Sequence, residues 1–123
     1  MTLQELYDRI DGNYAEAIGR LRMEKLITRF ILRFTNDGAC VRLQEAWAAG
    51  DDVATFEAAH AAKGVCANLS LTKLGNLASE ICEALRPGND ALRASTDVDA
   101  LVAELGQAYD KTVAAIKEYE ASL

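Results

Sequence analysis

Proline and histidine are scarce in this 123-residue chain, which has one of each, and cysteine occurs three times. With a single proline to interrupt helices and alanine throughout, the composition favours an all-helical fold. One histidine excludes catalysis by a histidine pair and confines any imidazole chemistry to His60. The number and spacing of Cys40, Cys66 and Cys82 match neither disulfide pairs nor a structural zinc site. We therefore expect reduced thiols.

Positive charge is also in short supply. Thirteen Lys and Arg residues stand against nineteen Asp and Glu residues, which gives a net charge of −6. Nucleic acids and anionic membranes bind clustered cations, so we expect neither as a partner. No apolar stretch approaches the ~20 residues that span a bilayer, and the N-terminal residues lack the pattern of a signal peptide. These features predict a cytoplasmic protein.

The pattern of apolar residues predicts an all-α fold. They recur at three- and four-residue intervals and nowhere alternate with a period of two. We predict four main helices at about 39–49, 52–69, 71–86 and 97–120, joined by short turns. Such helices form an antiparallel up-down four-helix bundle, here over residues 38–121. Accessory helices within residues 1–37, one of them at 22–35, complete a single domain, 1–123.

Helix ends can be predicted from capping residues. Asp51 or Asp52 is placed to accept a hydrogen bond from the free backbone N–H groups at the start of the second main helix. Ser70 is expected to cap the third in the same way. The segment Pro87-Gly88-Asn89-Asp90 predicts the turn that ends the third helix.

His60 lies in the predicted helix 52–69, on the face opposite its apolar stripe. At about 100° per residue the stripe falls on the far side and comprises Ala58, Ala59, Ala62, Val65, Cys66 and Leu69. Lys63, one turn after His60, can reach a group attached to the imidazole. Gly64 leaves the neighbouring surface free of a side chain. A glycine within a helix makes the helix about 1 kcal/mol less stable than an alanine would. Because neutral imidazole is nucleophilic near pH 7, the three residues suit a transferable phosphoryl group.

Each of these residues also has a plainer interpretation. A histidine on a bundle surface is commonly an inert, solvated residue, and a lone lysine is commonly a solvated charge. A glycine within a helix is often there to let a neighbouring helix approach. On spacing alone, phosphoryl transfer and the plainer interpretations are evenly balanced.

The segment from His60 to Leu74, HAAKGVCANLSLTKL, resembles the histidine-containing phosphotransfer (HPt) domain family. That family has a histidine, a lysine three residues on and a glycine four residues on. An Asn-Leu pair near the helix end and a Leu-rich helix follow. The resemblance extends upstream over Ile10–Leu21 and Leu26–Phe34, and so over nearly the whole chain.

The resemblance implies a four-helix bundle with accessory N-terminal helices, and it implies a role for each of three residues. His60 would accept the phosphoryl group, Lys63 would steady its oxygens, and Gly64 would give the space for approach. The implied partners are receiver domains of response regulators and hybrid sensor kinases, which supply the acceptor aspartate and the magnesium ion. The chain would then need no cofactor of its own. It has no Gly-rich nucleotide loop, so it is expected to carry phosphoryl groups without autonomous kinase activity.

Two positions depart from the family pattern. Many members have glycine where this chain has Ser70. Many also have a polar side chain, often glutamine, that hydrogen-bonds the imidazole where this chain has Cys82. A thiol is a poor substitute for an amide, so the ring is expected to be less firmly oriented. For Cys82 itself we favour plain packing.

The surface around His60 is the expected docking site, with Phe56, Glu57, Gly64 and Ala67 as its contact residues. No further apolar patch is evident, which favours a monomer. One alternative is a helical binding module that docks on a response regulator or sensor kinase and never carries phosphate. A second is a small enzyme built on carboxylates. Its candidates, the pairs Asp51-Asp52 and Glu80/Glu83, are better explained as caps and solvated faces.

Overall fold

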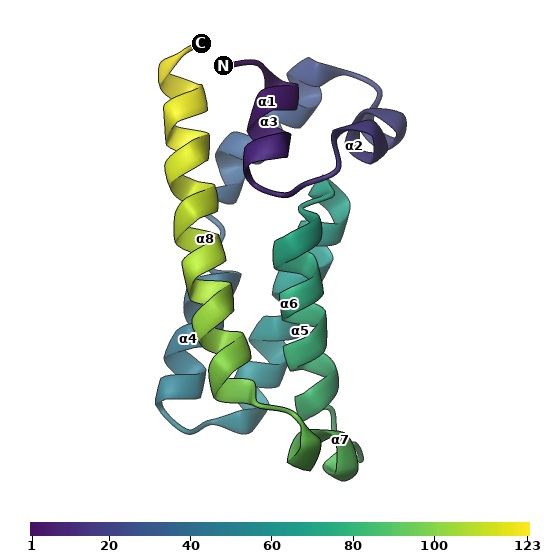
Figure 1. The fold of residues 1–123 in the computed structure, drawn as a ribbon, viewed down its shortest axis with the longest axis vertical. Coiled ribbons are helices and arrows are strands. Elements are labelled where there is room, and N and C mark those ends of the chain that lie inside the picture. Colours follow the sequence, from purple (N-terminus) through teal and green to yellow (C-terminus); the bar gives the residue numbers. More distant parts are fainter.

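The computed structural model describes residues 1–123 as eight α-helices with no strand (Figure 1). The helices are α1 (Leu3–Arg9), α2 (Tyr14–Leu21), α3 (Glu24–Phe34), α4 (Ala39–Ala48), α5 (Asp52–Leu69), α6 (Thr72–Leu85), α7 (Asp90–Ser95) and α8 (Val98–Ala121). The predicted all-α fold is confirmed. None of the helices combines the length and the apolar character that crossing a lipid bilayer requires.

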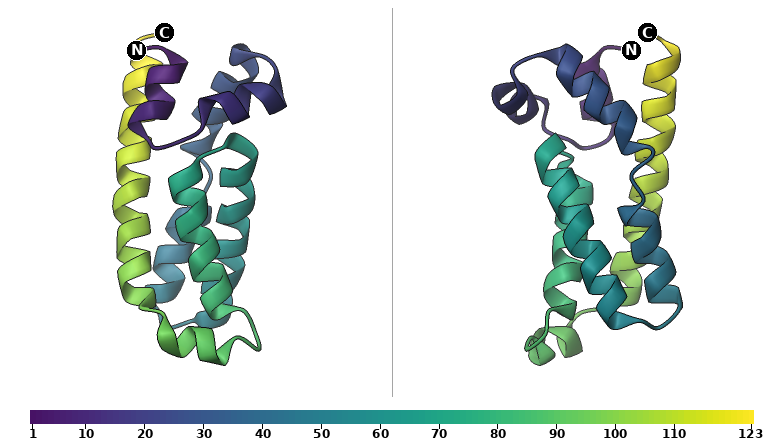
Figure 2. Two further views of the ribbon diagram at one scale, coloured as in Figure 1. Left: turned by 45° about the vertical axis from the view of Figure 1, so that its right-hand side comes forward. Right: turned by 180° about the vertical axis from the view of Figure 1, so that it is seen from behind.

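Four of the helices form the bundle. Helix α5 packs against α4 and α6, and α8 packs against the same two helices from the other side. The chain runs alternately down and up through α4, α5, α6 and α8 (Figures 1 and 2). Each of these helices begins and ends within one residue of its predicted bounds. The short helix α7 was not predicted, and it lies in the connection from α6 to α8.

One hydrophobic core joins the bundle to the N-terminal helices. Every helix except α7 contributes buried apolar residues to it. The largest fully buried apolar side chains are Leu6, Tyr7, Ile27, Ile31, Leu43, Leu71, Leu74, Ile81, Leu105 and Ile116. Each such side chain stabilises the fold by about 1.5–3 kcal/mol relative to an exposed one. Since four of them come from α1 and α3, these accessory helices are part of the folded unit.

The N-terminal helices hold the end of α5 in place. They lie over the end of the bundle where α5 turns into α6 (Figure 2). The buried Tyr7 hydroxyl donates to the Leu69 carbonyl oxygen at 2.7 Å. The Arg20 guanidinium donates to the carbonyl oxygens of Ala67 and Asn68 at 2.8 and 3.0 Å. These bonds satisfy carbonyl groups that have no partner within a helix end.

The two ends of α5 differ in how far the sequence predicted them. Asp51 caps the start, as expected, because its side chain accepts from the backbone N–H of Ala54 at 3.0 Å. The capping role predicted for Ser70 is wrong. Ser70 ends α5 in the left-handed conformation, with φ at 55°, and its hydroxyl donates to Glu16 at 2.8 Å. Helix α6 follows from Leu71 with no side-chain cap.

Candidate functional site

His60 lies exposed near the middle of α5, on the side that faces away from the core. Of the apolar stripe predicted opposite it, all members are buried except Val65, which is half-buried. The imidazole takes part in no hydrogen bond within the protein and pairs with no carboxylate. Its ring nitrogens are therefore open to a group that approaches from solvent.

Lys63 is the first cation along the helix from His60. Its side chain is half-buried, and its ammonium forms no ion pair within 4.0 Å. Side chains on a helix tilt toward its N-terminus, so Lys63 leans back toward the level of His60. The spacing predicted this arrangement, and the structure places the two residues on one exposed side of α5.

Gly64 borders open space. A Cβ atom added to Gly64 would meet no atom within 4 Å outside its own helix backbone. At Gly106, by contrast, an added Cβ would lie 2.6 Å from the Gln44 side chain. Close packing therefore explains Gly106 and does not explain Gly64. What Gly64 does is leave the surface beside the His60 ring clear.

The other predicted docking residues surround His60. The half-buried Phe56 ring lies 6.4 Å from the His60 ring, centre to centre, at an angle of 47°. Glu57 and Ala67 are exposed. Sequence reasoning missed Val53, which is 69% exposed and lies seven residues, or about two turns, before His60. That spacing puts Val53 on the same face and is the signal that could have identified it.

The residue that follows α6, Arg86, is a cation that the sequence did not point to. The Arg86 guanidinium carbon lies 5.5 Å from the centre of the Phe56 ring. The same guanidinium donates to the Glu83 carboxylate at 2.8 and 3.3 Å. These hydrogen bonds lower the pKa of Glu83, and the positive charge of Lys63 contributes in the same direction. The Glu83 side chain is 40% exposed, so its ion pair with Arg86 lies on a solvated face, as expected.

The cysteines are buried and free. Cys82, where the resemblance led us to expect a polar side chain, is completely buried and makes no hydrogen bond to His60. Burial raises the pKa of the Cys82 thiol and that of the Cys40 thiol, the latter to about 12. Neither thiol is ionised near neutral pH, which agrees with a packing role for Cys82.

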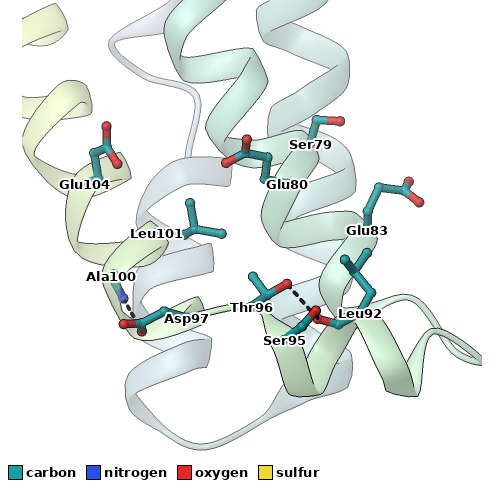
Figure 3. A pocket seen from close by; sticks show the side chains of 10 residues that line it. All are labelled: Ser79, Glu80, Glu83, Leu92, Ser95, Thr96, Asp97, Ala100, Leu101 and Glu104. Atoms are coloured by element: carbon teal, nitrogen blue, oxygen red, sulfur yellow. Dashed lines mark hydrogen bonds between the residues drawn. The ribbon is translucent and has the colours of Figure 1, made fainter.

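A separate groove of about 560 Å³ lies between α6, α7 and the start of α8 (Figure 3). Four carboxylates line it, from Glu80, Glu83, Asp97 and Glu104, and no cation does. Several of its polar groups are already bonded within the protein; Asp97, for example, caps α8. Such a groove repels a phosphorylated group. Nowhere in the chain do three His, Cys, Asp or Glu side chains come together as a set that could hold a metal ion.

The chain is thus a helical bundle with its one histidine exposed in the middle of α5. A family model described as the Hpt domain matches residues 35–115. This match covers more than half of the chain and includes His60, Lys63 and Gly64, so the protein belongs to the Hpt domain family. Domains of this family transfer phosphoryl groups through a histidine in phosphorelay signalling, between receiver domains and kinases, and are not autonomous kinases. Searches of curated proteins and of solved structures gave no match.

Proposed function

We propose that this protein is a phosphorelay carrier that accepts a phosphoryl group on His60 from a receiver-domain aspartate and passes it to another receiver. One observation carries the proposal. The only histidine of an Hpt-family chain is exposed in mid-helix, with the unpaired Lys63 one turn away and open space at Gly64. Surface histidines are common, but this combination is what a transferable group requires.

The proposed reaction exchanges one bond for another. The lone pair of Nε2 on the neutral imidazole attacks phosphorus in line, and the N–P bond forms as the bond to the aspartate oxygen breaks. The aspartate leaves as a carboxylate. In the onward step a second receiver's aspartate attacks the same phosphorus, and His60 is regenerated as neutral imidazole. No other reactant is consumed.

The chain's own residues contribute position and charge. Lys63 offsets negative charge on the phosphoryl oxygens, and such electrostatic stabilisation dominates the catalysis of phosphoryl transfer. Gly64 admits the receiver's backbone to the imidazole. In this proposal the magnesium ion comes with the receiver domain and the carrier holds no cofactor.

Docking uses the exposed face of α5. Val53 and Phe56 provide apolar contact on one side of His60, and Gly64 and Ala67 provide a low surface on the other. Glu57 borders the groove between α4 and α5 and gives this face a negative edge. The proposed partners are response regulator receivers and hybrid sensor kinases. The chain acts as a monomer in the cytoplasm, where its three thiols stay reduced.

A phosphotransfer assay tests this function. A phosphorylated receiver is incubated with the wild-type chain and with His60→Gln, and the label is followed on both proteins. The carrier function predicts a label on the wild type that is labile in acid and stable in alkali, and no label on His60→Gln. If the wild type binds receivers and none transfers label to it, the chain is a docking module and the proposal is wrong.

A further inference from the structure

We propose that Arg86 is a second phosphoryl-binding residue, and that Glu83 restrains it until His60 is phosphorylated. This inference rests on the proposed function, because it concerns the phosphorylated state of His60. It identifies a cation directly after α6, outside the helix that carries the histidine, together with a carboxylate that competes for it.

The pairing of α5 with α6 places Arg86 level with Phe56, about one turn before His60 on α5. Arg86 lies over Phe56 at 5.5 Å, and a Cβ added to Gly75 would lie 3.3 Å from the Cβ of Cys66. Higher residue numbers on α6 thus oppose lower numbers on α5, so the helices are antiparallel. In this register His60 is level with the turn of α6 that directly precedes Arg86.

The Arg86 side chain runs back along that turn. Its Nη2 and Nε atoms donate to the two carboxylate oxygens of Glu83 at 2.8 and 3.3 Å. The guanidinium lies beside the Phe56 ring, with its carbon 5.5 Å from the ring centre. Because the His60 ring lies only 6.4 Å from the same Phe56 ring, both groups adjoin one aromatic side chain.

Two cations therefore approach His60 from opposite directions along α5. Lys63 leans toward it from the C-terminal side, and Arg86 reaches toward it from the N-terminal side. Glu83 lies close enough to both that each lowers its pKa, with Arg86 the larger cause. The Glu83 carboxylate thus pairs with Arg86 and leaves the Lys63 ammonium without an ion pair.

The ion pair between Arg86 and Glu83 is one that a phosphoryl group can displace. Both side chains are about 40% exposed, at 41% and 40%, and ion pairs with this exposure are weak. A phosphoryl group carries up to two negative charges and presents several oxygens to the planar guanidinium, which binds such groups with two hydrogen bonds. Glu83 carries one charge. After phosphorylation the Arg86 guanidinium is expected to leave Glu83 for the phosphoryl oxygens.

The test is the equilibrium of label between a phosphorylated receiver and the full chain, approached from both directions. Arg86→Gln is expected to shift it about tenfold toward the receiver, the loss expected for one charge-assisted hydrogen-bond set. Arg86→Lys, which keeps a point charge, should recover part of the shift. Glu83→Gln should shift the equilibrium toward His60. In the double variant the Glu83 effect should shrink, because much of it acts through Arg86.

Arg93→Gln is the matched control. Arg93 also lies over an aromatic ring, that of Trp47 at 5.2 Å, and it also pairs with a carboxylate, Asp52, at 3.7 Å. It belongs to α7 and lies over the Trp47 side chain of α4. Loss of this arginine should leave the equilibrium unchanged, and an equal shift in Arg93→Gln would overturn the role of Arg86.

The outcomes separate the inference from the proposed function. If the wild type takes up no label from any receiver, the proposed function fails. If the wild type is labelled on His60 and neither Arg86→Gln nor Glu83→Gln moves the equilibrium, only the inference fails. It also fails if Arg86→Gln raises the receiver concentration for half-maximal rate and leaves the equilibrium unchanged, since Arg86 then serves docking. Should Arg86→Gln unfold, Glu83→Gln decides alone.

Discussion

The Tyr7 hydroxyl and the Leu69 carbonyl oxygen, 62 residues apart in the sequence, form a buried hydrogen bond of 2.7 Å. It joins the first helix of the chain to the last residue of the helix that carries His60. Burial raises the pKa of Tyr7, so the hydroxyl stays protonated and remains a donor at every pH near neutrality. The accessory helices therefore anchor α5 at its C-terminal end and leave its middle free.

Removing this hydrogen bond should destabilise the whole domain. Tyr7→Phe leaves the Leu69 carbonyl without its buried donor, and we expect the free energy of unfolding to fall by about 1–2 kcal/mol. Denaturant titration followed by circular dichroism measures this change. Tyr14→Phe is the control, because its hydroxyl bonds to Glu24 in an exposed position. Equal losses in the two variants would contradict the anchoring role of Tyr7.

The left-handed backbone of Ser70 should destabilise the fold, and substitution by glycine should remove this strain. Its φ of 55° is unfavourable for a residue with a Cβ, so Ser70→Gly should be about 1 kcal/mol more stable than Ser70→Ala. The Ser70 hydroxyl is also the main cause of the lowered pKa of Glu16, with Arg20 second. A carboxyl group whose pKa is lowered by folding stabilises the folded state at pH values above its pKa in the unfolded chain. This stabilisation is lost as the pH falls through the folded-state pKa. The difference between wild type and Ser70→Ala should accordingly narrow on acidification; a difference that widens would contradict this account.

Substitutions at Gly64 should change helix stability and access to His60 independently. Because a Cβ there meets nothing, Gly64→Ala should raise the free energy of unfolding by about 1 kcal/mol. Gly64→Leu should also fold, yet it should strongly slow phosphoryl transfer by blocking the receiver's approach. Gly19→Ala, at another open helical glycine, should stabilise the protein and leave transfer unchanged. Unimpaired transfer to Gly64→Leu would remove the role assigned to this glycine.

Lys63 should matter to the reaction and not to the fold. Lys63→Ala removes the charge nearest the phosphoryl oxygens along α5, and we expect transfer to slow by about tenfold or more. Lys63→Arg should retain part of the rate. Circular dichroism should show unchanged helicity, since the ammonium makes no ion pair in the structure. A drop in helicity in Lys63→Ala would mean that Lys63 is structural.

Local signals in the sequence were sufficient to predict the bundle helices. The bounds of α5 were predicted without error, because Asp51 is a strong cap and the apolar stripe is continuous. Helix α7 escaped prediction since none of its residues is buried, so it has no apolar periodicity to reveal it. The role of Ser70 was misjudged because its partners, Glu16 and Arg20, lie about fifty residues earlier.

In the candidate site, too, local spacing predicted some residues and missed those that come from elsewhere in the chain. His60, Lys63 and Gly64 share one helix, so spacing alone brought them together. Arg86 meets Phe56 only through the antiparallel register of α5 and α6, which no local pattern contains. A row of exposed positive charges was also not predicted. Lys25, Arg29 and Arg33 repeat every four residues along α3, all exposed and none in an ion pair, although the net charge is negative.

The most direct test of the central claim is to locate the phosphoryl group itself. The chain is phosphorylated by a receiver, kept alkaline, and examined by phosphorus NMR and by mass spectrometry of its peptides. The account predicts one phosphoramidate resonance and a single modified peptide that contains His60, with both signals absent from His60→Gln. A phosphoryl group on any other residue, or an unchanged signal in His60→Gln, would contradict it.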